Sequence, residues 1–292
     1  MRMRPPELGQ LAARHEPGTD TLRLCDDGTR RSPLVTSTAS SRSSSMTPPN
    51  LVLHVLPPSH PCRAAEAALR HKGLAYEKID LVPGAHVDEM RRIYGEGHTT
   101  VPGLLVDGEP VHGSRAIFAR LEELAPDPTL YPAPMAEAVR DAERWGDEEL
   151  QDLGRRLPWA AMHFRPEALG TFSDGGRPLD GPGTDFAIKY VHSSWSYHRI
   201  TAARLHEDLA GLPAKLDHVD RLAEQGLVGG ERPTAADLQI ASTLRVLMTV
   251  GDLAPLLEGR GAERLARSWF PEYPGHIPAG AYPAGWVPTR QA

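Results

Sequence analysis

The chain has 292 residues, which is long enough for two domains. Its net charge of −6 at pH 7 gives no basic footprint for nucleic acid, and no apolar run approaches the roughly 18 residues of a membrane-spanning helix. We therefore expect neither a nucleic acid nor a membrane as a partner. The two cysteines, Cys25 and Cys62, lie in very different contexts, so the sequence predicts no disulfide framework and fits a reducing cytoplasm.

Residues 1–48 are predicted to be a disordered tail. They hold few aliphatic side chains and no aromatic one, and residues 37–45 are nearly all Ser or Thr. Such a composition cannot bury enough apolar surface to offset the entropy of ordering the chain. Met46 stands just ahead of the first predicted strand. One hypothesis is that translation starts there, which would leave residues 1–45 out of the mature protein and Cys25 with no role.

A short apolar run at 51–56 predicts a buried strand, which a proline pair ends. Ser59 follows at the N-cap position of a predicted helix, and Pro61 lies in its first turn, where a missing N–H costs nothing. Small and apolar residues then recur at helical spacing as far as Gly73. The pattern places the Ser59 hydroxyl and the Cys62 thiol at the start of a helix, whose free N–H groups and positive dipole end suit an anion such as a thiolate.

The elements that follow alternate between strand and helix. Residues 75–81 predict a second strand, residues 84–94 a helix, and the Asp107-Gly108 pair between two apolar runs a hairpin. A further helix is predicted directly after the hairpin. The order β-α-β-α-β-β-α matches a thioredoxin-like α/β domain, which we place at residues 49–126.

The second half of the sequence is predicted to be helical. A proline-rich linker at 127–134 leads to an all-helical domain at 135–292, in which apolar residues step by three and four. A loop rich in Gly and Pro is predicted over 158–184, and a helix over 185–209. Pro213 is expected to bend the apolar repeat that comes next.

Thr234 and Asp237 form a capping-box pattern, with Asp in place of the usual Glu. The helix behind them is apolar almost all round, so we expect it to be the buried axis of the helical domain. The aromatic and proline-rich tail at 270–286 is predicted to pack over the helices or near an acceptor pocket.

Four motifs together resemble the glutathione transferases, most closely the theta-like serine class: Ser59-His60-Pro61-Cys62-Arg63 after a strand, Val101-Pro102, Gly113-Ser114 and Thr234–Asp237. The resemblance implies the glutathione-transferase architecture, in which a thioredoxin-like domain binds the thiol and an all-helical domain lines the acceptor pocket. It implies a cytoplasmic detoxification enzyme that conjugates glutathione to a small electrophilic substrate and needs no metal. It also implies a homodimer, with the first domain of each subunit against the second domain of the other.

The resemblance implies roles for three residues around the thiol. Ser59 matches the serine whose hydroxyl donates a hydrogen bond to the sulfur and stabilises the thiolate. Val101 matches the residue whose backbone pairs with the cysteinyl unit of the ligand, and Pro102 matches the cis-proline that follows it. From the residues alone, Ser59 can also be only an N-cap, and Pro102 an ordinary trans proline at the start of an edge strand.

The resemblance also implies contacts with the two ends of glutathione. Ser114 matches the hydroxyl at a helix start that receives the γ-glutamyl carboxylate, and His86 resembles a theta-class residue that reaches the glycyl carboxylate. Gly113, in the same predicted cofactor site, departs from the Glu or Gln that usually holds the γ-glutamyl amino group. This removes a charge-assisted hydrogen bond of about 1.5–3 kcal/mol. The Lys or Gln that the family usually has shortly before the cis-proline is also missing, and His98 is the nearby residue here. The sequence therefore leaves open a cofactor that is a small thiol other than glutathione.

Two alternative functions remain open from the sequence. A non-catalytic relative would keep the scaffold as a binding or interaction module, and Gly113 favours it. A thiol reductase would depend on Cys62 alone, because Ser59 stands where a dithiol site has its first cysteine; the other interpretation of Cys62 is a buried small hydrophobe. The 13 histidines show no spacing typical of a metal site, so we expect no metal.

Overall fold

A computed structural model of the chain describes residues 48–173 and 176–289. The tail predicted at 1–48 therefore lies outside the described residues, apart from its last position. Within the described residues, the first half of the fold is built on a four-stranded sheet of order β2-β1-β3-β4. β1 pairs parallel with β2 and antiparallel with β3, which pairs antiparallel with β4. The strands are β1 (Leu51–Val55), β2 (Glu77–Asp80), β3 (Gly103–Val106) and β4 (Glu109–His112).

β1 is a buried central strand because its side chains are mostly apolar and both of its edges are paired. Leu51, Leu53 and Val55 are all at most 2% exposed. The turn between β3 and β4 contains Asp107 with φ 52° and Gly108 with φ 88°. Two successive positive φ values are the geometry of a hairpin turn that follows the twist of its strands. The predicted hairpin is confirmed.

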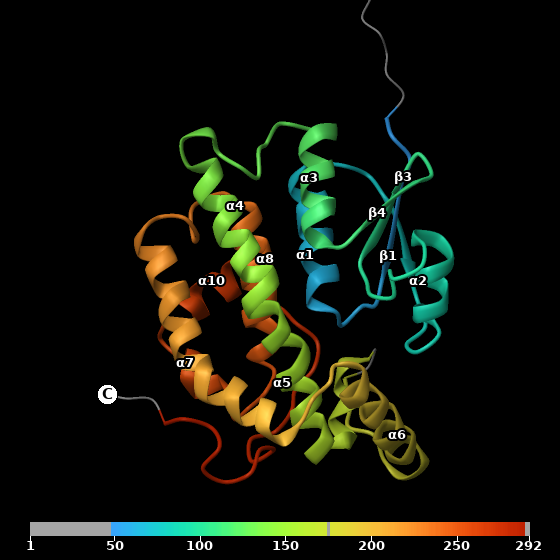
Figure 1. Cartoon of the computed structure of the whole chain (residues 1–292), viewed down its shortest axis with the longest axis vertical. Coiled ribbons are helices and arrows are strands. Elements are labelled where there is room, and N and C mark those ends of the chain that lie inside the picture. The colour runs from blue at the N-terminus through green and yellow to red at the C-terminus, as the bar shows by residue number, and fades with distance from the viewer. Residues whose placement is uncertain (1–47, 174–175, 290–292) are drawn as a thin grey trace, which may run out of the picture. The chain divides into compact units, whose positions relative to one another are not determined.

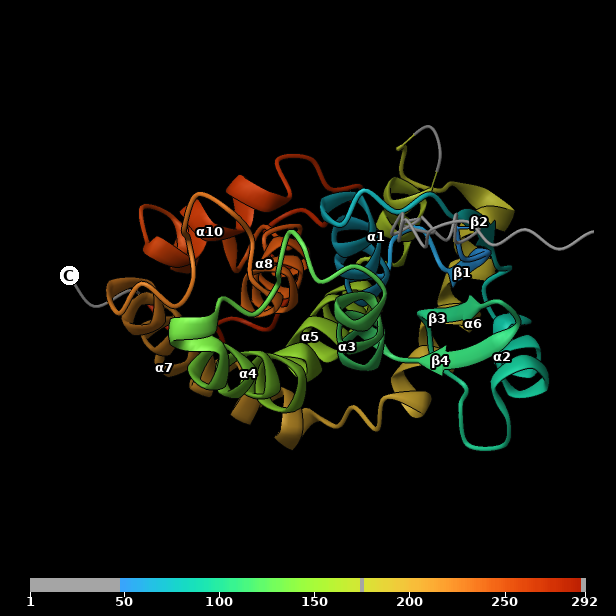
Figure 2. The same ribbon diagram turned by 90° about the horizontal axis from the view of Figure 1, so that it is seen from above.

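Helices cover both faces of this sheet (Figure 1 and Figure 2). α1 (His60–His71) and α3 (Ser114–Leu124) lie side by side on one face, and α2 (His86–Tyr94) lies on the other. The buried alanines and Leu69 of α1 form the stripe that the predicted helical spacing requires. The order β-α-β-α-β-β-α confirms the predicted thioredoxin-like fold.

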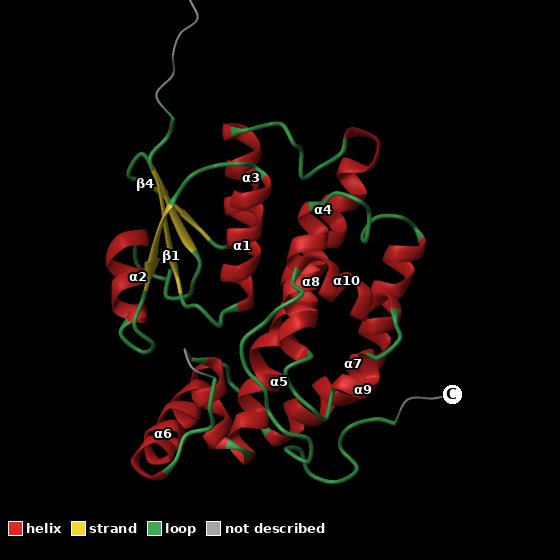
Figure 3. Cartoon of the chain, turned by 180° about the vertical axis from the view of Figure 1, so that it is seen from behind, coloured by secondary structure: helices red, strands yellow, loops and turns green. Residues whose placement is uncertain are grey.

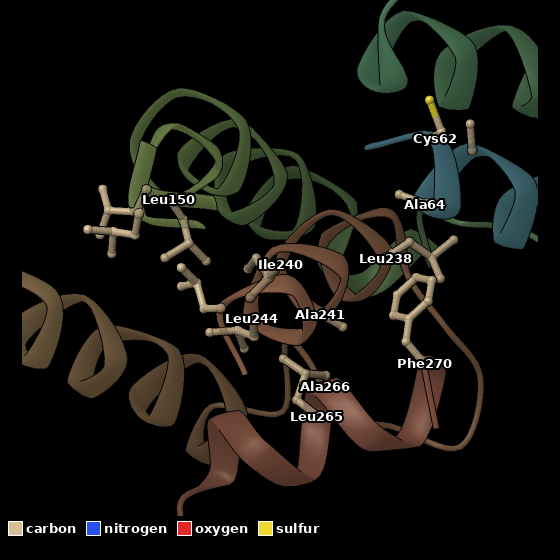
Figure 4. Close-up of a cluster of buried hydrophobic side chains, with 14 of the residues drawn as sticks. Cys62, Ala64, Leu150, Leu238, Ile240, Ala241, Leu244, Leu265, Ala266 and Phe270 are labelled. Carbon is tan, nitrogen blue, oxygen red and sulfur yellow. The ribbon is translucent and has the colours of Figure 1, made fainter. Parts of the chain in front are cut away.

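A helical region follows the sheet (Figure 3). Its axis is α8 (Ala235–Leu247), in which every residue except Arg245 is buried. The neighbouring helices α1, α4, α5 and α10 pack around α8, and Figure 4 shows Leu238, Ile240 and Leu244 projecting into the core between them. The remaining helices are α4 (Ala136–Trp145), α5 (Gln151–Phe164), α6 (Gly181–Tyr197), α7 (Ala202–Glu224), α9 (Ala254–Leu257) and α10 (Gly261–Trp269).

The start of α8 is fixed by the predicted capping box. The Asp237 N–H donates to Thr234 Oγ1 at 3.2 Å, and the Thr234 N–H donates to Asp237 Oδ2 at 2.8 Å. Both interactions satisfy N–H groups that a buried helix start would otherwise leave unpaired. The predicted capping box and the predicted burial of this helix are confirmed. Among the described residues, no helix has the length and apolar character needed to cross a membrane.

The loop predicted over 158–184 is wrong, because much of this stretch is helical. α5 continues through Pro158 to Phe164, a 3₁₀ segment spans Pro166–Phe172, and α6 begins at Gly181. A proline inside a helix costs about 3 kcal/mol, but tertiary packing supplies most helical stability. Here Pro158 and its apolar neighbours in α5 are buried against the rest of the core, and this packing outweighs the local cost.

The single helix predicted over 185–209 is also wrong, because the structure has two helices there. α6 ends at Tyr197, and Arg199 adopts a left-handed conformation with φ 51°. Thr201 then caps α7, since its Oγ1 accepts a hydrogen bond from the Arg204 N–H at 3.1 Å. Pro213 lies inside α7 without ending it.

The aromatic tail packs back onto the helices, as predicted. Phe270, Ile277 and Tyr282 are buried, and the Tyr282 hydroxyl donates to the carbonyl of Leu157 at 2.8 Å. Nearer the sheet, the Tyr273 hydroxyl donates to the carbonyl of Pro58 at 2.7 Å. The tail therefore contacts both the middle of α5 and the residue before Ser59.

Candidate functional site

Ser59 lies between the end of β1 and the start of α1. Its N–H donates to the carbonyl of Leu56 at 2.9 Å, and its own carbonyl accepts from the N–H of Arg63 at 3.1 Å. Its backbone has the extended conformation of an N-cap (φ −76°, ψ 120°), but its side chain makes no capping hydrogen bond. The half-buried hydroxyl instead contacts the Cys62 thiol. The hydroxyl therefore does not serve the N-cap role that the residue pattern alone allowed.

Cys62 is fully buried in the first turn of α1. Burial raises the pKa of this thiol to about 12, although hydrogen bonds from Ser59 and from the backbone of Leu56 act in the opposite direction. The thiol therefore stays protonated near neutral pH. Since only a thiolate is a competent nucleophile, this environment fits a buried small hydrophobe rather than a reactive monothiol.

The peptide bond between Val101 and Pro102 is cis, as predicted. The carbonyl of Pro102 accepts a hydrogen bond from the N–H of Gly113 at 3.0 Å, which ties this loop to the start of α3. Among residues 48–173 and 176–289, the backbone of Val101 has no hydrogen-bond partner. Its N–H and C=O are thus free to pair with an extended ligand in the manner of an added strand.

A histidine network supports the loop that precedes the cis bond. The His112 ring donates from Nε2 to the carbonyl of Thr100 at 2.8 Å, and burial lowers the pKa of His112. The His98 ring contacts the His112 ring in a tilted arrangement, with centroids 4.4 Å apart and an interplanar angle of 41°. On the same side of the sheet, His54 Nδ1 and the Tyr94 hydroxyl form a buried hydrogen bond of 2.8 Å. The hydrogen bond from His112 positions the Thr100 peptide, which leads directly into the backbone of Val101.

Ser114 is the first residue of α3 and is only 3% exposed. Its hydroxyl donates to Gln239 Oε1 of α8 at 2.8 Å, and Gln239 Nε2 donates to Gln151 Oε1 at 2.9 Å. The hydroxyl predicted to receive a carboxylate is therefore already used by the helical region. Gly113, the N-cap of α3, has φ 89°, a conformation that side-chain-bearing residues rarely adopt. What remains free at this helix start is its backbone N–H groups.

His86 begins α2, and its Nδ1 accepts a hydrogen bond from the N–H of Gly84 at 3.1 Å. Burial lowers the pKa of His86, so the ring is neutral near pH 7 and carries its proton on Nε2. Within the described part of the chain, His86 makes no hydrogen bond to Ser59, Val101 or Ser114. The structure thus links Val101, Pro102 and Gly113 through hydrogen bonds and the chain, and leaves His86 apart from that network.

A cavity of about 500 Å³ borders the cis-proline loop, and no pattern in the sequence indicates it. One wall is Thr100, the residue before Val101. The opposite wall comes from α5, the end of α6, the α6–α7 connection and the first turn of α7. The lining residues there are Asp152, Arg155, Arg156, Tyr197, His198, Arg199 and Arg204. The neighbouring arginines Arg155 and Arg156 are an ordinary pattern for a surface helix and do not indicate a binding site by themselves. The cavity becomes evident only because α5, α6 and α7 converge around it.

His60, the neighbour of Ser59, connects α1 to the wall of this cavity. Its ring lies against α5, where a side chain added at Gly154 would come within 3.1 Å of Nε2. Burial, with smaller effects from Arg155 and His198, holds the pKa of His60 well below its usual value. Its Nε2 is buried without a hydrogen-bond partner in the described residues. The neutral ring therefore packs between the Ser59 loop and the arginine-bearing face of α5.

Residues 53–129 match the family model of the glutathione S-transferase N-terminal domain. This match supports a relationship of the chain to the glutathione S-transferase superfamily. A thioredoxin-like domain followed by a helical region is the glutathione-transferase architecture, so the predicted fold class is confirmed. No curated protein sequence matches the chain.

Three solved structures illustrate the likeness. A glutathione S-transferase from Rhodospirillum rubrum has 21% identity, with 75% of this chain and 86% of that chain covered and a TM-score of 0.46. FzlA from C. crescentus has 16% identity, with 82% and 96% covered and a TM-score of 0.46. A glutathione transferase from Phanerochaete chrysosporium has 18% identity, with 75% and 96% covered and a TM-score of 0.49.

No group of three or more His, Cys, Asp or Glu side chains in the described residues has the arrangement of a metal site.

Proposed function

We propose that the protein is a glutathione-transferase-like enzyme of the theta-like serine class. It attaches a low-molecular-weight thiol, glutathione or a related small thiol, to a small electrophile. The observation that carries this proposal is the Ser59 hydroxyl, which lies at the N-terminus of α1 and makes no capping hydrogen bond. Its contact is the Cys62 thiol, so its O–H must turn from Cys62 to the sulfur of the ligand. The match of residues 53–129 to the glutathione S-transferase N-terminal domain supports it.

The chemistry follows from what this part of the chain offers a thiol ligand. The free backbone of Val101 pairs with the cysteinyl unit and holds its sulfur beside α1. The Ser59 hydroxyl donates to the sulfur, and the helix dipole also favours the anion. The thiolate attacks the electrophilic carbon of the second substrate, a C–S bond forms, and the leaving group departs with the bonding pair. A hydrogen bond to a charged partner is worth about 1.5–3 kcal/mol, so removal of the hydroxyl should slow conjugation about 10- to 100-fold.

A second candidate is a non-catalytic binding module on the same scaffold. Two observations favour it: the Ser114 hydroxyl is bound to Gln239, and Gly113 offers no side chain to the amino end of glutathione. Both would weaken the hold on the γ-glutamyl unit. They equally favour a thiol cofactor other than glutathione within the first proposal.

Ligand binding is tested first, by thermal stabilisation of the chain with a panel of low-molecular-weight thiols that includes glutathione. A ligand that binds only the native state raises the melting temperature, and the thiol with the largest shift is the cofactor of choice. Turnover is then measured with that thiol and chlorodinitrobenzene, for the wild type, Ser59→Ala and the control Ser268→Ala on α10.

We expect activity in the wild type and the control, and a 10- to 100-fold loss in kcat/KM for Ser59→Ala. Thiol binding without turnover on any acceptor would select the binding module. Turnover that survives in Ser59→Ala and is lost in Cys62→Ser would select the reductase alternative.

The remaining expectations from the resemblance are proposals of the same kind. We propose a cytoplasmic detoxification role and a homodimer that pairs the thioredoxin-like domain of each subunit with the helical domain of its partner. Light scattering coupled to size-exclusion chromatography distinguishes a dimer from a monomer.

A further inference from the structure

The cavity beside Thr100 carries an excess of positive charge. Four guanidinium groups converge on it, from Arg155, Arg156, Arg199 and Arg204. Two carboxylates pair with them, those of Asp152 and Asp208. His198 adds no charge, since burial, helped by the nearby Arg155, lowers its pKa to about 4. Near neutral pH the cavity and its paired groups therefore hold two more positive than negative charges.

The arginines differ in how much hydrogen-bonding capacity they have left. All three guanidinium nitrogens of Arg156 donate: two to the oxygens of Asp208, at 2.6 and 2.9 Å, and one to Asp152 at 2.7 Å. Within the described residues, Arg155 and Arg204 have only long ion pairs, at 3.6 Å to Asp152 and 3.8 Å to Asp208. These two side chains keep most of their donors free for a ligand.

Arg199 has the fewest partners of the four arginines among the described residues. Its side chain makes no hydrogen bond or ion pair with any residue in the described ranges. Its backbone adopts φ 51° at the end of α6, a position where helices commonly place glycine. A side chain in this conformation is strained, and such strain is concentrated at functional positions. The charged side chain lines the cavity, is exposed to solvent and has no partner among the described residues.

The cavity is also coupled to the predicted thiol site. The Tyr197 hydroxyl, in the cavity wall, shares a hydrogen bond of 2.9 Å with Thr99 Oγ1. Thr99 and Thr100 lead directly into Val101, whose free backbone is proposed to hold the thiol. A ligand in the cavity would thus lie alongside the sulfur.

We propose that the electrophilic substrate carries an anionic group, a carboxylate, which Arg155, Arg199 and Arg204 bind in this cavity. The proposal rests on the proposed function and names the substrate class of the same site. Guanidinium groups bind carboxylates through paired N–H donors, and such charge-assisted bonds are about twice as strong as neutral ones. The carboxylate orients the acceptor so that its reactive carbon faces the thiolate. In the test reaction a C–S bond forms, the C–Cl bond breaks, chloride leaves with the bonding pair, and the thiol proton passes to solvent.

The experiment compares chlorodinitrobenzoate with its methyl ester, using the full chain and the best-binding thiol. Each kcat/KM is divided by the rate constant of the uncatalysed reaction, because the ester group also changes the size and the intrinsic reactivity of the acceptor. We expect kcat/KM to favour the carboxylate at least about ten-fold, and Arg199→Gln and Arg204→Gln each to lower that preference about ten-fold. The control Lys189→Gln removes one exposed positive charge from α6 and should leave the preference unchanged. If one arginine variant fails to fold, the other still gives the result.

A binding measurement makes the test independent of turnover. Without any thiol, chlorodinitrobenzoate should bind to the wild type in calorimetry and more weakly to Arg199→Gln. The added negative charge should also raise the pKa of His198, read from its NMR titration, because it offsets the effect of Arg155. Equal turnover of acid and ester would overturn the proposal and leave the proposed function standing. Arginine-dependent binding of the acid without turnover would support the cavity assignment and defeat the proposed function.

A final measurement distinguishes the carboxylate of the electrophilic substrate from the glycyl carboxylate of glutathione as the group that the arginines bind. Affinity is measured for glutathione and for its glycyl ethyl ester in the wild type and in Arg199→Gln. We expect the variant to leave the ratio of the two affinities unchanged. A loss of affinity confined to glutathione with a free glycyl carboxylate would assign the arginines to the cofactor and overturn the proposal.

Discussion

Replacement of Glu143 by Gln should stabilise the protein near neutral pH and above. Glu143 lies in α4, only 3% exposed, and both of its oxygens accept from the Tyr131 hydroxyl, at 3.1 and 3.0 Å. Burial raises the pKa of this carboxyl from 4.5 to about 7. The fold therefore favours the protonated form. This stabilisation is fully present below pH 4.5 and is lost as pH rises through about 7. At about 1.36 kcal/mol per pKa unit, the loss amounts to about 3 kcal/mol.

Urea unfolding at several pH values measures this effect directly. A Gln at this position keeps an oxygen for the Tyr131 hydroxyl and never ionises. The free energy of unfolding of Glu143→Gln relative to the wild type should thus rise by about 3 kcal/mol between pH 4.5 and about pH 8. Glu137→Gln, at an exposed position of the same helix, serves as the control and should show no such trend. A pH-independent difference between Glu143→Gln and the wild type would refute the reasoning.

Three further predictions concern packing and the buried groups. Gly103→Ala should cost about 1–3 kcal/mol of stability, because the new Cβ would lie 2.2 Å from the Tyr94 ring; an unchanged urea midpoint would contradict this. Asp208→Ala should cost about 3–5 kcal/mol, because it leaves the buried Arg156 without its main partner, and a loss below about 1 kcal/mol would show that the pair is not effectively buried. The Cys62 thiol should resist iodoacetamide at neutral pH in the native protein and react in urea, as mass spectrometry can show; rapid native alkylation would reverse our assignment of its raised pKa.

Local patterns in the sequence predicted most of the thioredoxin-like half. The apolar run of β1 and the Asp107-Gly108 hairpin each depend on residues within a few positions of one another. So does the Thr234–Asp237 capping box, which the sequence predicted in the helical region. The same local rules failed over 158–209. There a proline that normally ends a helix is carried inside α5 by burial, and a polar stretch without glycine breaks into α6 and α7 at Arg199.

Some features of the candidate site also follow from neighbouring residues, whereas others depend on tertiary packing. The sequence by itself determined where a hydroxyl meets a helix start at Ser59 and where a proline follows Val101, since both are matters of neighbouring residues. Only the tertiary structure decided that the Ser114 hydroxyl belongs to Gln239, 125 positions away, and that Arg199 and Arg204 face Thr100 across a cavity. Helical periodicity says which face of a helix is buried but not which helix covers it. Such contacts depend on how separate helices pack together, and no spacing along the chain encodes that.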